Sequence, residues 1–587
     1  MKSNRRLLLA LAAALSATTV MPAAGIATAN ASAQSPGIEE MVKSTSLSGS
    51  FLAAQIAARD NDDVAAVAFY ERSLELDPDN VELKRLYFLS LTANGRIGDA
   101  VKVAKGIPAS DEQAPVVRLV TAVDAIKRKD WKGAQEQFKS VSTGDLDIMV
   151  EQLSLAWAAF GEGDHKRAMK IAGDINGPDW VQVIRNYHSG LLAALAGDDK
   201  TAIAPLTSAI ENEDAAAVLS ETYMRAMETL IGAHARLGEF DKARQVLDRG
   251  LEMLPNYAPF AELTALVDAK KPVPLLIETP SLGAAEVYYN VGTAISRQGG
   301  TTFAQGYLQL ADYIDNGNDV VTMALAGIFE AQKRHERANE YYARIGKDSP
   351  FHRRAELEYA LNLNDLEKVD EAKAKLRALV EEEPDDLLAY STLGGVLSQH
   401  DEFAEAAKVY DAAVATIDKP LPQHWNLYYR RGIAYERIKQ WDKAEPNFKK
   451  ALELSPNQAD VLNYLGYSWI DQGINLDEGL ALIRQAVDLS PRKGYIIDSL
   501  GWAYYKLGRY EEAVKELERA VEILPQDPVL NDHLGDAYWK AGRKLEATFQ
   551  WNHALASKPE PADEAWIRQK LDKGWFEKPS APTAAAQ

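Results

Sequence analysis

The sequence has 587 residues, of which 26% are charged, and its formal net charge is −20. A chain of this length exceeds what one hydrophobic core supports, so it predicts several domains or an extended array of repeats. The acidic balance argues against nucleic acid as a partner, and no run of Lys and Arg interleaved with aromatic residues reverses it locally. Cysteine is absent, which excludes disulfides, thiolate zinc sites and thiol nucleophiles.

The N-terminus, residues 1–33, has the pattern of a secretory signal peptide. Residues 2–6 carry three positive charges, residues 7–15 are apolar, and residues 29–33 hold a small-x-small cleavage motif. The alternative, a retained anchor helix, is disfavoured because the apolar stretch is far shorter than the roughly 20 residues that a bilayer requires. We therefore predict an exported, periplasmic protein that is not integral to a membrane. Residues 4–8 loosely resemble a twin-arginine signal, which leaves a second export route open.

After a predicted linker over residues 34–47, one small residue recurs with a nearly constant spacing. Members of this set are 34 residues apart from Ala66 to Ala202 and again from Ala304 to Ala406. The full set is Ala66, Ala100, Ala134, Ala168, Ala202, Ala243, Ala304, Ala338, Ala372, Ala406, Ala444, Gly479, Ala513 and Ala547. A repeat of this length predicts stacked helix pairs, each of which buries its apolar face only against its neighbours.

Turn signals divide each repeat into two helices. In six repeats a glycine stands five positions before the small residue, where a left-handed conformation can end the first helix. These glycines are Gly95, Gly163, Gly197, Gly238, Gly508 and Gly542. In most of the better repeats a proline follows the small residue by twelve and stops the second helix. These prolines are Pro78, Pro255, Pro350, Pro384, Pro456, Pro491, Pro525 and Pro559.

The last repeats carry enough of a known pattern to suggest a family. One of them reads Leu500-Gly501, Tyr504, Ala513, Leu517, Ala520 and Pro525. This pattern resembles the tetratricopeptide repeat, and the resemblance continues more weakly, in register, back to about Ser50. It implies an all-α protein, an α-solenoid of about fourteen helix pairs wound as a right-handed superhelix in two halves. It also implies a scaffold for protein or peptide partners rather than an enzyme.

The spacing breaks once, and this break sets the predicted domain boundaries. We expect an N-terminal solenoid over 48–268, a proline-containing joint over 269–286 and a C-terminal solenoid over 287–561. The joint could be a hinge, a binding element or a passive insertion. An amphipathic capping helix over 562–576 and a disordered tail over 577–587 complete the chain.

No pattern in the sequence predicts catalysis, a cofactor or a small-molecule substrate. The sequence contains no His-Glu-x-x-His pair, no phosphate-binding Gly-x-x-x-x-Gly-Lys-Ser/Thr loop and no Gly-x-Ser-x-Gly elbow. Asp532, His533 and Asp536 could meet a metal on one helical turn, but acidic clusters on helices are usually solvated faces. The acidic cluster at 60–63 lacks the closing glycine and glutamate of a calcium loop and is better explained as a turn.

Four first helices of the C-terminal half carry a glycine at an equivalent position, namely Gly432, Gly466, Gly501 and Gly535. In the geometry of the family, residues three before and one and four after each of these glycines project toward the concave side. The predicted peptide-binding groove is made of Tyr429, Asn463, Tyr467, Asp498, Trp502, Tyr505, Asp532, Asp536 and Trp539. Aromatic side chains offer a large contact area at little entropic cost, and Asn463 could bond an N–H and a C=O of an extended ligand. The alternative is that the aromatic residues pack between adjacent first helices.

The C-terminal half also resembles a narrower group. Residues 462–467, 532–536 and 551–554 are similar to envelope repeat proteins that act as adaptors for a carboxyl-terminal processing protease. That resemblance implies delivery of cell-wall hydrolases to the protease. Those adaptors are typically lipoproteins, and this chain has no cysteine to carry a lipid. The alternative is an assembly or secretion component of the envelope, such as a polysaccharide-export or pilus-type system.

Overall fold

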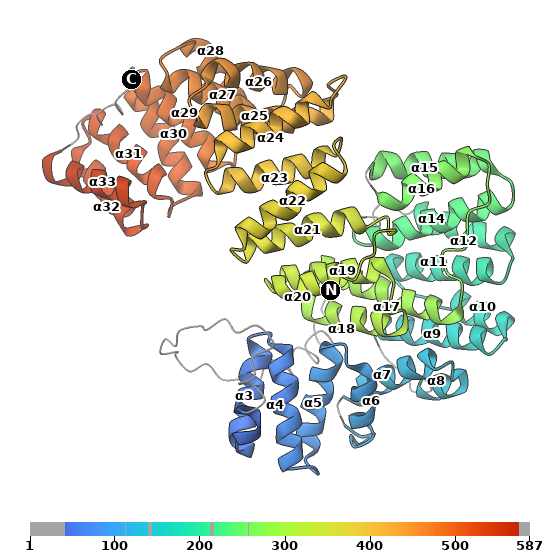
Figure 1. Ribbon diagram of the computed structural model, residues 1–587. Coiled ribbons are helices and arrows are strands. Elements are labelled where there is room, and N and C mark those ends of the chain that lie inside the picture. Colours follow the sequence, from blue (N-terminus) through green and yellow to red (C-terminus); the bar gives the residue numbers. More distant parts are fainter. Residues whose placement is uncertain (1–40, 112, 139–143, 212–216, 256, 575–587) are drawn as a thin grey trace. The chain divides into compact units, whose positions relative to one another are not determined.

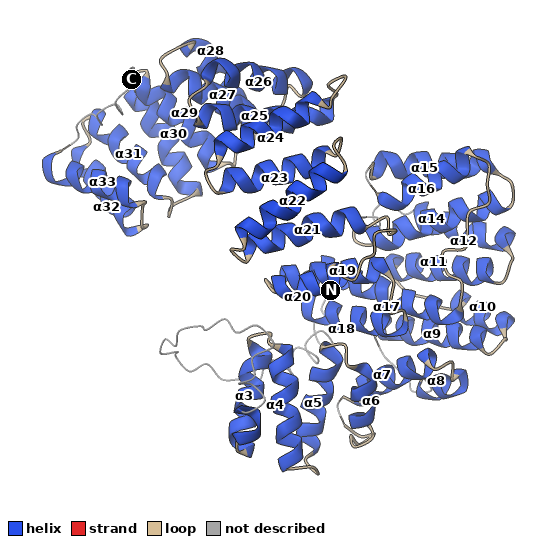
Figure 2. Ribbon diagram, viewed as in Figure 1, coloured by secondary structure: helices blue, strands red, loops and turns tan. Residues whose placement is uncertain are grey.

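A computed structural model describes residues 41–574 apart from 112, 139–143, 212–216 and 256. Within these residues the regular structure is helical and no strand occurs (Figures 1 and 2). The prediction of an all-α fold of stacked helix pairs is therefore confirmed. None of the described helices combines the length and the apolar character that a bilayer crossing requires. The predicted signal peptide and tail lie outside the described residues.

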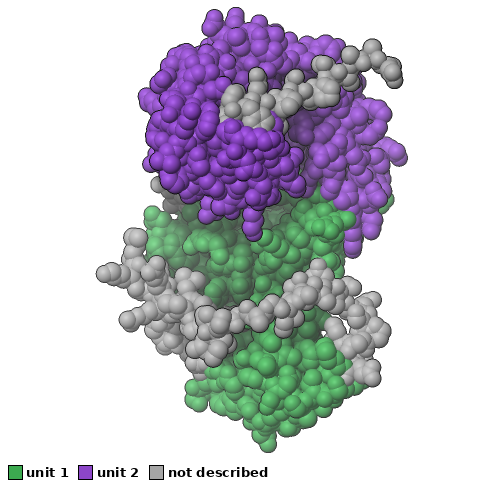
Figure 3. All heavy atoms as spheres, turned by 90° about the vertical axis from the view of Figure 1, so that its left-hand side faces the viewer, with its two compact units in different colours: residues 1–367 green, residues 368–587 purple. Residues whose placement is uncertain are grey.

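The chain divides into two compact units, residues 1–367 (unit 1) and 368–587 (unit 2), which Figure 3 colours green and purple. The helices of unit 1 are α3 (Leu47–Arg59), α4 (Asp63–Leu76), α5 (Val81–Ala93), α6 (Ile97–Ala104), α7 (Ala114–Lys127), α8 (Trp131–Gln137), α9 (Asp145–Gly161), α10 (His165–Gly173), α11 (Asp179–Leu195), α12 (Asp199–Glu211), α14 (Ser220–Arg236), α15 (Phe240–Met253), α16 (Ala258–Asp268), α17 (Pro280–Arg297), α18 (Thr301–Ile314), α19 (Asp319–Ala331), α20 (His335–Tyr342) and α21 (His352–Asp365).

Unit 2 continues the same alternation of first and second helices. Its helices are α22 (Val369–Glu382), α23 (Leu387–Gln399), α24 (Phe403–Ala415), the short 3₁₀ helix η1 (Pro422–His424), α25 (Trp425–Arg437), α26 (Trp441–Leu454), α27 (Ala459–Asp471), α28 (Leu476–Leu489), α29 (Gly494–Lys506), α30 (Tyr510–Ile523), α31 (Pro528–Lys540), α32 (Lys544–Ala556) and α33 (Pro561–Lys573). The predicted capping helix is α33, which packs against α32.

Each first helix ends at a residue with a left-handed backbone, as the glycine pattern predicts. All six predicted glycines have φ between 73° and 98°. The equivalent position in other repeats is also left-handed but is held by Asn61, Lys129, Gly299, Lys333, Glu367, Asp401 and Lys439. The turn is therefore constant along the chain, although a non-glycine residue pays a steric penalty there.

The recurring small residues lie on second helices and are buried, which confirms their place in the helix contacts. The thirteen alanines are at most 1% exposed, and Gly479 is also buried. Gly479 shows why the position must be small. A Cβ on Gly479 would lie 2.9 Å from the carbonyl oxygen of Gly466 on α27, and a Cβ on Gly466 would lie 2.6 Å from that of Gly479. The backbones of α27 and α28 therefore touch directly.

The predicted joint at 269–286 does not separate the two compact units. The prolines do interrupt the helices there, because α16 ends at Asp268 and α17 begins at Pro280. However, α17 packs back onto α7, α9, α11 and α14, so both sides of the interruption belong to unit 1. The units divide at Glu367 instead. A break in spacing carries no information about where the chain packs afterwards.

Candidate functional site

The predicted groove residues all lie on α25, α27, α29 and α31, the first helices of four successive pairs in unit 2. We call the surface formed by these four helices the first-helix face of unit 2. Seven of the nine predicted residues are half-buried, whereas Asp498 and Asp536 are buried. None of the nine side chains is fully exposed to solvent.

Several of the predicted aromatic residues stack across successive first helices. Tyr429 on α25 meets Tyr464 on α27 edge-on, with 6.0 Å between ring centroids. Trp502 on α29 lies between Tyr505, at 4.6 Å, and His533 of α31, at 3.9 Å, in nearly parallel stacks. Burial raises the pKa of Tyr429 to about 12. These contacts support the alternative stated above, in which the aromatic residues pack between adjacent first helices, because both faces of the Trp502 ring are covered.

The predicted acidic residues also pair with the next first helix. Asp498 accepts a hydrogen bond from His533 Nδ1 at 3.0 Å. Burial lowers the pKa of His533, but the nearby Asp498 carboxylate more than offsets this and the pKa ends above its usual value. His533 therefore lies between a carboxylate and the Trp502 ring, two neighbours that favour its protonated form.

The other two carboxylates hold the capping helix. The ammonium of Lys570 on α33 lies 2.5 Å from Asp532 and 2.7 Å from Asp536, and its side chain is fully enclosed. Trp551 Nε1 donates a further hydrogen bond to Asp536 at 3.0 Å. Burial, together with the charge of Asp536, raises the pKa of Asp532. A lysine thus occupies the acidic pair that the sequence alternatively suggested for a metal.

Asn463 is a predicted residue whose side chain has an unused hydrogen-bond acceptor, and Tyr467 lies beside it on the same helix. The Asn463 side-chain oxygen is buried and accepts no hydrogen bond from any described residue. Burial raises the pKa of Tyr467 well above its usual value, with Asp471 and Asp498 adding to the effect. Both residues lie on α27, one turn apart on the same face. This part of the face retains an amide acceptor next to a phenol.

One neighbouring feature escaped the sequence reasoning. Tyr495, at the start of α29, is 47% exposed and donates a hydrogen bond to Asp460 of α27 at 2.6 Å. Lys493 binds the same carboxylate at 3.0 Å. Repeat spacing could have suggested Tyr495, because Asp460, Tyr495 and Val529 occupy equivalent positions six residues before their helix glycines.

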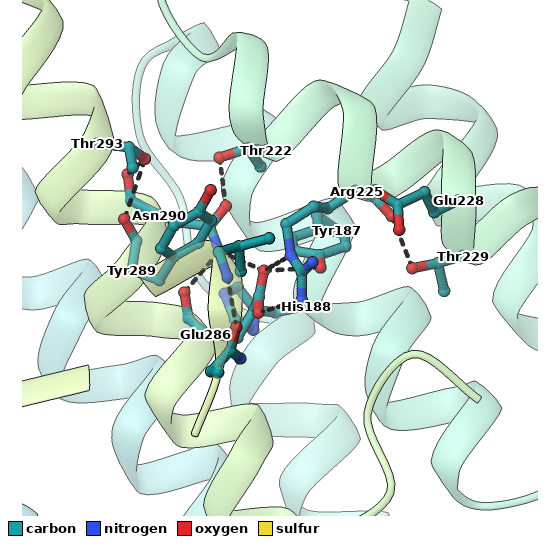
Figure 4. Close-up of polar contacts among 12 residues, drawn as sticks. Tyr187, His188, Thr222, Arg225, Glu228, Thr229, Glu286, Tyr289, Asn290 and Thr293 are labelled. Carbon is teal, nitrogen blue, oxygen red and sulfur yellow. Dashed lines mark hydrogen bonds and ion pairs between the residues drawn. The ribbon is translucent and has the colours of Figure 1, made fainter. Parts of the chain in front are cut away.

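In unit 1 the corresponding face is already filled. Residues 283–293 of α17 are buried without interruption, and α17 packs on the first helices α7, α9, α11 and α14. Figure 4 shows Glu286 and Asn290 of α17 directed at side chains of α11 and α14. The sequence reasoning missed this packing. Of the two faces of first helices, the one in unit 2 carries no such helix among the described residues of that unit.

Comparison with known families identifies the repeats. A family model described as "TPR repeat" matches residues 501–542, and two described as "Tetratricopeptide repeat" match residues 358–423 and 425–458. A TPR repeat-containing protein of Pseudomonas aeruginosa is 29% identical over 200 residues, which are 34% of this chain and 33% of that protein. A lipoprotein NlpI homolog of Haemophilus influenzae is 29% identical over 92 residues, or 16% of this chain and 29% of that protein. The chain therefore spans about a third or less of these relatives.

Among solved structures, a tetratricopeptide repeat protein from Parabacteroides merdae is similar with a TM-score of 0.36 and 16% identity, over 43% of this chain and 96% of that chain. The Cut9–Hcn1 hetero-tetramer of APC/C gives a TM-score of 0.31 and 14% identity, over 79% and 98%. The fold assignment rests on the helices of this chain and not on these two similarities. Residues 358–423, 425–458 and 501–542 match tetratricopeptide repeats, and the remaining helix pairs continue the same helix–turn–helix pattern.

Proposed function

We propose that this protein is a non-enzymatic scaffold of the bacterial envelope that holds a protein partner on the first-helix face of unit 2. Tetratricopeptide repeats support the general role, because stacked helix pairs present long faces for polypeptide segments. The location on the face rests on one observation. Asn463 has a buried amide oxygen without a hydrogen-bond donor, which a backbone N–H of a bound segment would satisfy once the amide turns toward it.

The aromatic stacks serve this proposal in a supporting way. Trp502, Tyr505 and His533 fix the neighbouring first helices relative to each other, so the face is preorganised before a partner arrives. We assign the direct contacts to Asn463, Tyr467 and the exposed ring of Tyr495.

Site-specific photo-crosslinking in the native host tests the location. A photoreactive amino acid in place of Tyr467 should crosslink a partner, and adding Asn463→Ala should abolish the product. The matched control carries the same group at Phe549, which is 58% exposed on the second helix α32. Crosslinking from Phe549 but not from Tyr467, or a product that Asn463→Ala leaves unchanged, would place the partner elsewhere.

The finer role follows from the identity of the crosslinked protein. We propose an adaptor for an envelope protease, on the similarity of residues 462–467, 532–536 and 551–554 to such adaptors. Crosslinks to a processing protease or to a cell-wall hydrolase are the expected result. Crosslinks to export or pilus subunits would favour the alternative, an assembly or secretion component.

Export is part of the same proposal. The charged, apolar and small-residue segments of the N-terminus support a cleaved signal peptide. Sequencing the N-terminus of the mature protein should begin near Ser32 or Gln34. Recovery of the intact leader, starting at Met1, from the soluble cytoplasm would contradict export.

A further inference from the structure

The helix α17 lies across unit 1 in the manner of a bound helical ligand. Its contacts move from one first helix to the next along its length. Ser281 donates a hydrogen bond to the carbonyl of Ile126 on α7, and Gly283 packs on the Trp157 ring of α9. Further along, Arg297 binds Glu221 of α14 with 2.8 Å between Nε and the carboxylate. One helix therefore crosses α7, α9, α11 and α14 in order.

The four first helices that α17 crosses each have a second helix of their own. These first helices pack against α8, α10, α12 and α15. On its other side, α17 pairs with its own second helix α18, where Gly292 lies against Leu308. The connection to α17 runs through residues 269–279, which are not helical and contain two prolines. The helix therefore reaches this face through an irregular link, with α18 on its opposite side.

Recognition on this face is polar in its details. Arg225 of α14 binds Glu286 with 2.8 Å between Nη2 and Oε2, and Tyr187 of α11 donates to the same carboxylate at 2.9 Å. Thr222 of α14 donates a hydrogen bond to Asn290. Arg225 is 5% exposed and Glu286 2%. Since a shift of α17 by one residue would leave these buried groups without partners, the network fixes one register.

Steric fit at Gly283 also contributes to recognition of α17. A Cβ on Gly283 would lie 2.4 Å from the Trp157 ring, so only a residue without a side chain fits against α9. Gly283, Glu286 and Asn290 are spaced by three and four residues and therefore share one side of the helix. The face is therefore complementary to a helix that carries a small residue, a carboxylate and an amide in this order.

We propose that the face formed by α7, α9, α11 and α14 is a helix-binding site, and that α17 is its resident ligand. The ligand class is a helix with glycine, a carboxylate three positions later and an amide four positions after that. This face of unit 1 is thereby closed to partners that do not present the same pattern.

An exchange experiment on the full-length chain tests this. Protease sites are inserted in the connection at residues 270–276 and in the turn at Gln298–Gly300, and the purified chain is cut at both. α17 is then held by non-covalent contacts alone, those with the proposed face and those with α18. We expect it to co-elute with the cut chain on gel filtration, and to be exchanged by excess fluorescein-labelled peptide of residues 279–298, measured by anisotropy.

Matched peptides give the specificity. Glu286→Ala in the peptide should weaken exchange at least tenfold, whereas Ser296→Ala, outside the continuously buried stretch, should leave it unchanged. If cutting unfolds unit 1, the wild-type peptide should restore helical circular dichroism and the Glu286→Ala peptide should not. Failure of the wild-type peptide both to exchange and to restore helicity, or equal action of the wild-type and Glu286→Ala peptides, would overturn the proposal.

Discussion

The guanidinium of Arg225 on α14 meets the carboxylate of Glu286 on α17 at two points, and solvent reaches neither side chain appreciably. Burial pushes the pKa of Glu286 upward, but Arg225 more than offsets this and the pKa ends below its usual value. The carboxylate therefore stays charged inside unit 1. This ion pair links α14 to α17 inside the core of unit 1.

Removing one partner of the pair should destabilise unit 1 strongly. Glu286→Ala leaves a buried guanidinium without its carboxylate, and such changes typically cost about 3–5 kcal/mol. Urea unfolding followed by circular dichroism measures the loss. Asp248→Ala is the control, since Asp248 pairs with Arg244 at the surface, where such pairs are worth about 0–1 kcal/mol.

The double variant Arg225→Met with Glu286→Leu should be more stable than Glu286→Ala alone, because it leaves no uncompensated buried charge. A single variant that unfolds like the wild type would show that solvent reaches the pair.

The buried His188 should make unit 1 sensitive to acid. Its Nδ1 accepts a hydrogen bond from Trp157 at 3.1 Å, and burial lowers its pKa to about 4. A folded-state pKa below the unfolded value of about 6.5 means that the unfolded chain binds a proton more readily. Stability is therefore lost as the pH falls from about 6.5 toward 4, by on the order of 3 kcal/mol in all.

The variant His188→Gln keeps an acceptor for Trp157 and does not titrate. Its stability relative to the wild type, measured by urea unfolding, should improve between pH 7 and pH 5. If wild type and variant lose stability in parallel over this range, His188 is not responsible for the acid sensitivity.

The left-handed turns provide a pair of changes with opposite signs. Gly508 has φ 73° and open space around its missing Cβ, so Gly508→Ala should cost about 1 kcal/mol through backbone strain alone. Lys333 adopts φ 60° at the equivalent position of another repeat. Lys333→Gly should relieve the strain and gain about 0.5–1 kcal/mol. Thermal unfolding of both variants checks the prediction, and shifts of the same sign would contradict it.

The contact at Ala513 should not tolerate a larger side chain. Ala513 on α30 is fully buried, and Ala513→Leu should overpack the helix contact at a cost of about 1–3 kcal/mol. Lys515→Leu, on the exposed side of the same helix, is the control and should change little. Equal melting temperatures for both variants would mean that the recurring small residues do not form the seam.

The repeat itself could be predicted because its signals are local. A buried alanine, a left-handed turn and a terminating proline each depend on a few neighbouring residues, and Ala513, Gly508 and Pro525 all lie where the spacing indicated. Partners across repeats depend instead on how successive pairs rotate. No spacing in the sequence indicated that His533 would cover Trp502 or that Lys570 would bind Asp532 and Asp536.

The packing of α17 left one signal in the sequence. From Pro280 to Ser296 the only charged residue is Glu286, and apolar or small residues lie on all sides of the helix. A helix without a polar face is buried all round, so it could not have been an outer first helix with one side in solvent. The sequence did not predict which face α17 would cover, because that depends on the path of the chain through residues 269–279.

The contacts of α17 also set how unit 1 can change in evolution. Repeat proteins commonly gain or lose whole units, because each pair touches only its neighbours. Between α7 and α14 this freedom is lost, since a deleted pair would carry Arg225 away from Glu286 and Trp157 away from Gly283. Unit 2 has no comparable crossing helix among its described residues. We expect homologues to vary in length through the number of pairs in unit 2, and to keep the number between α7 and α14 constant.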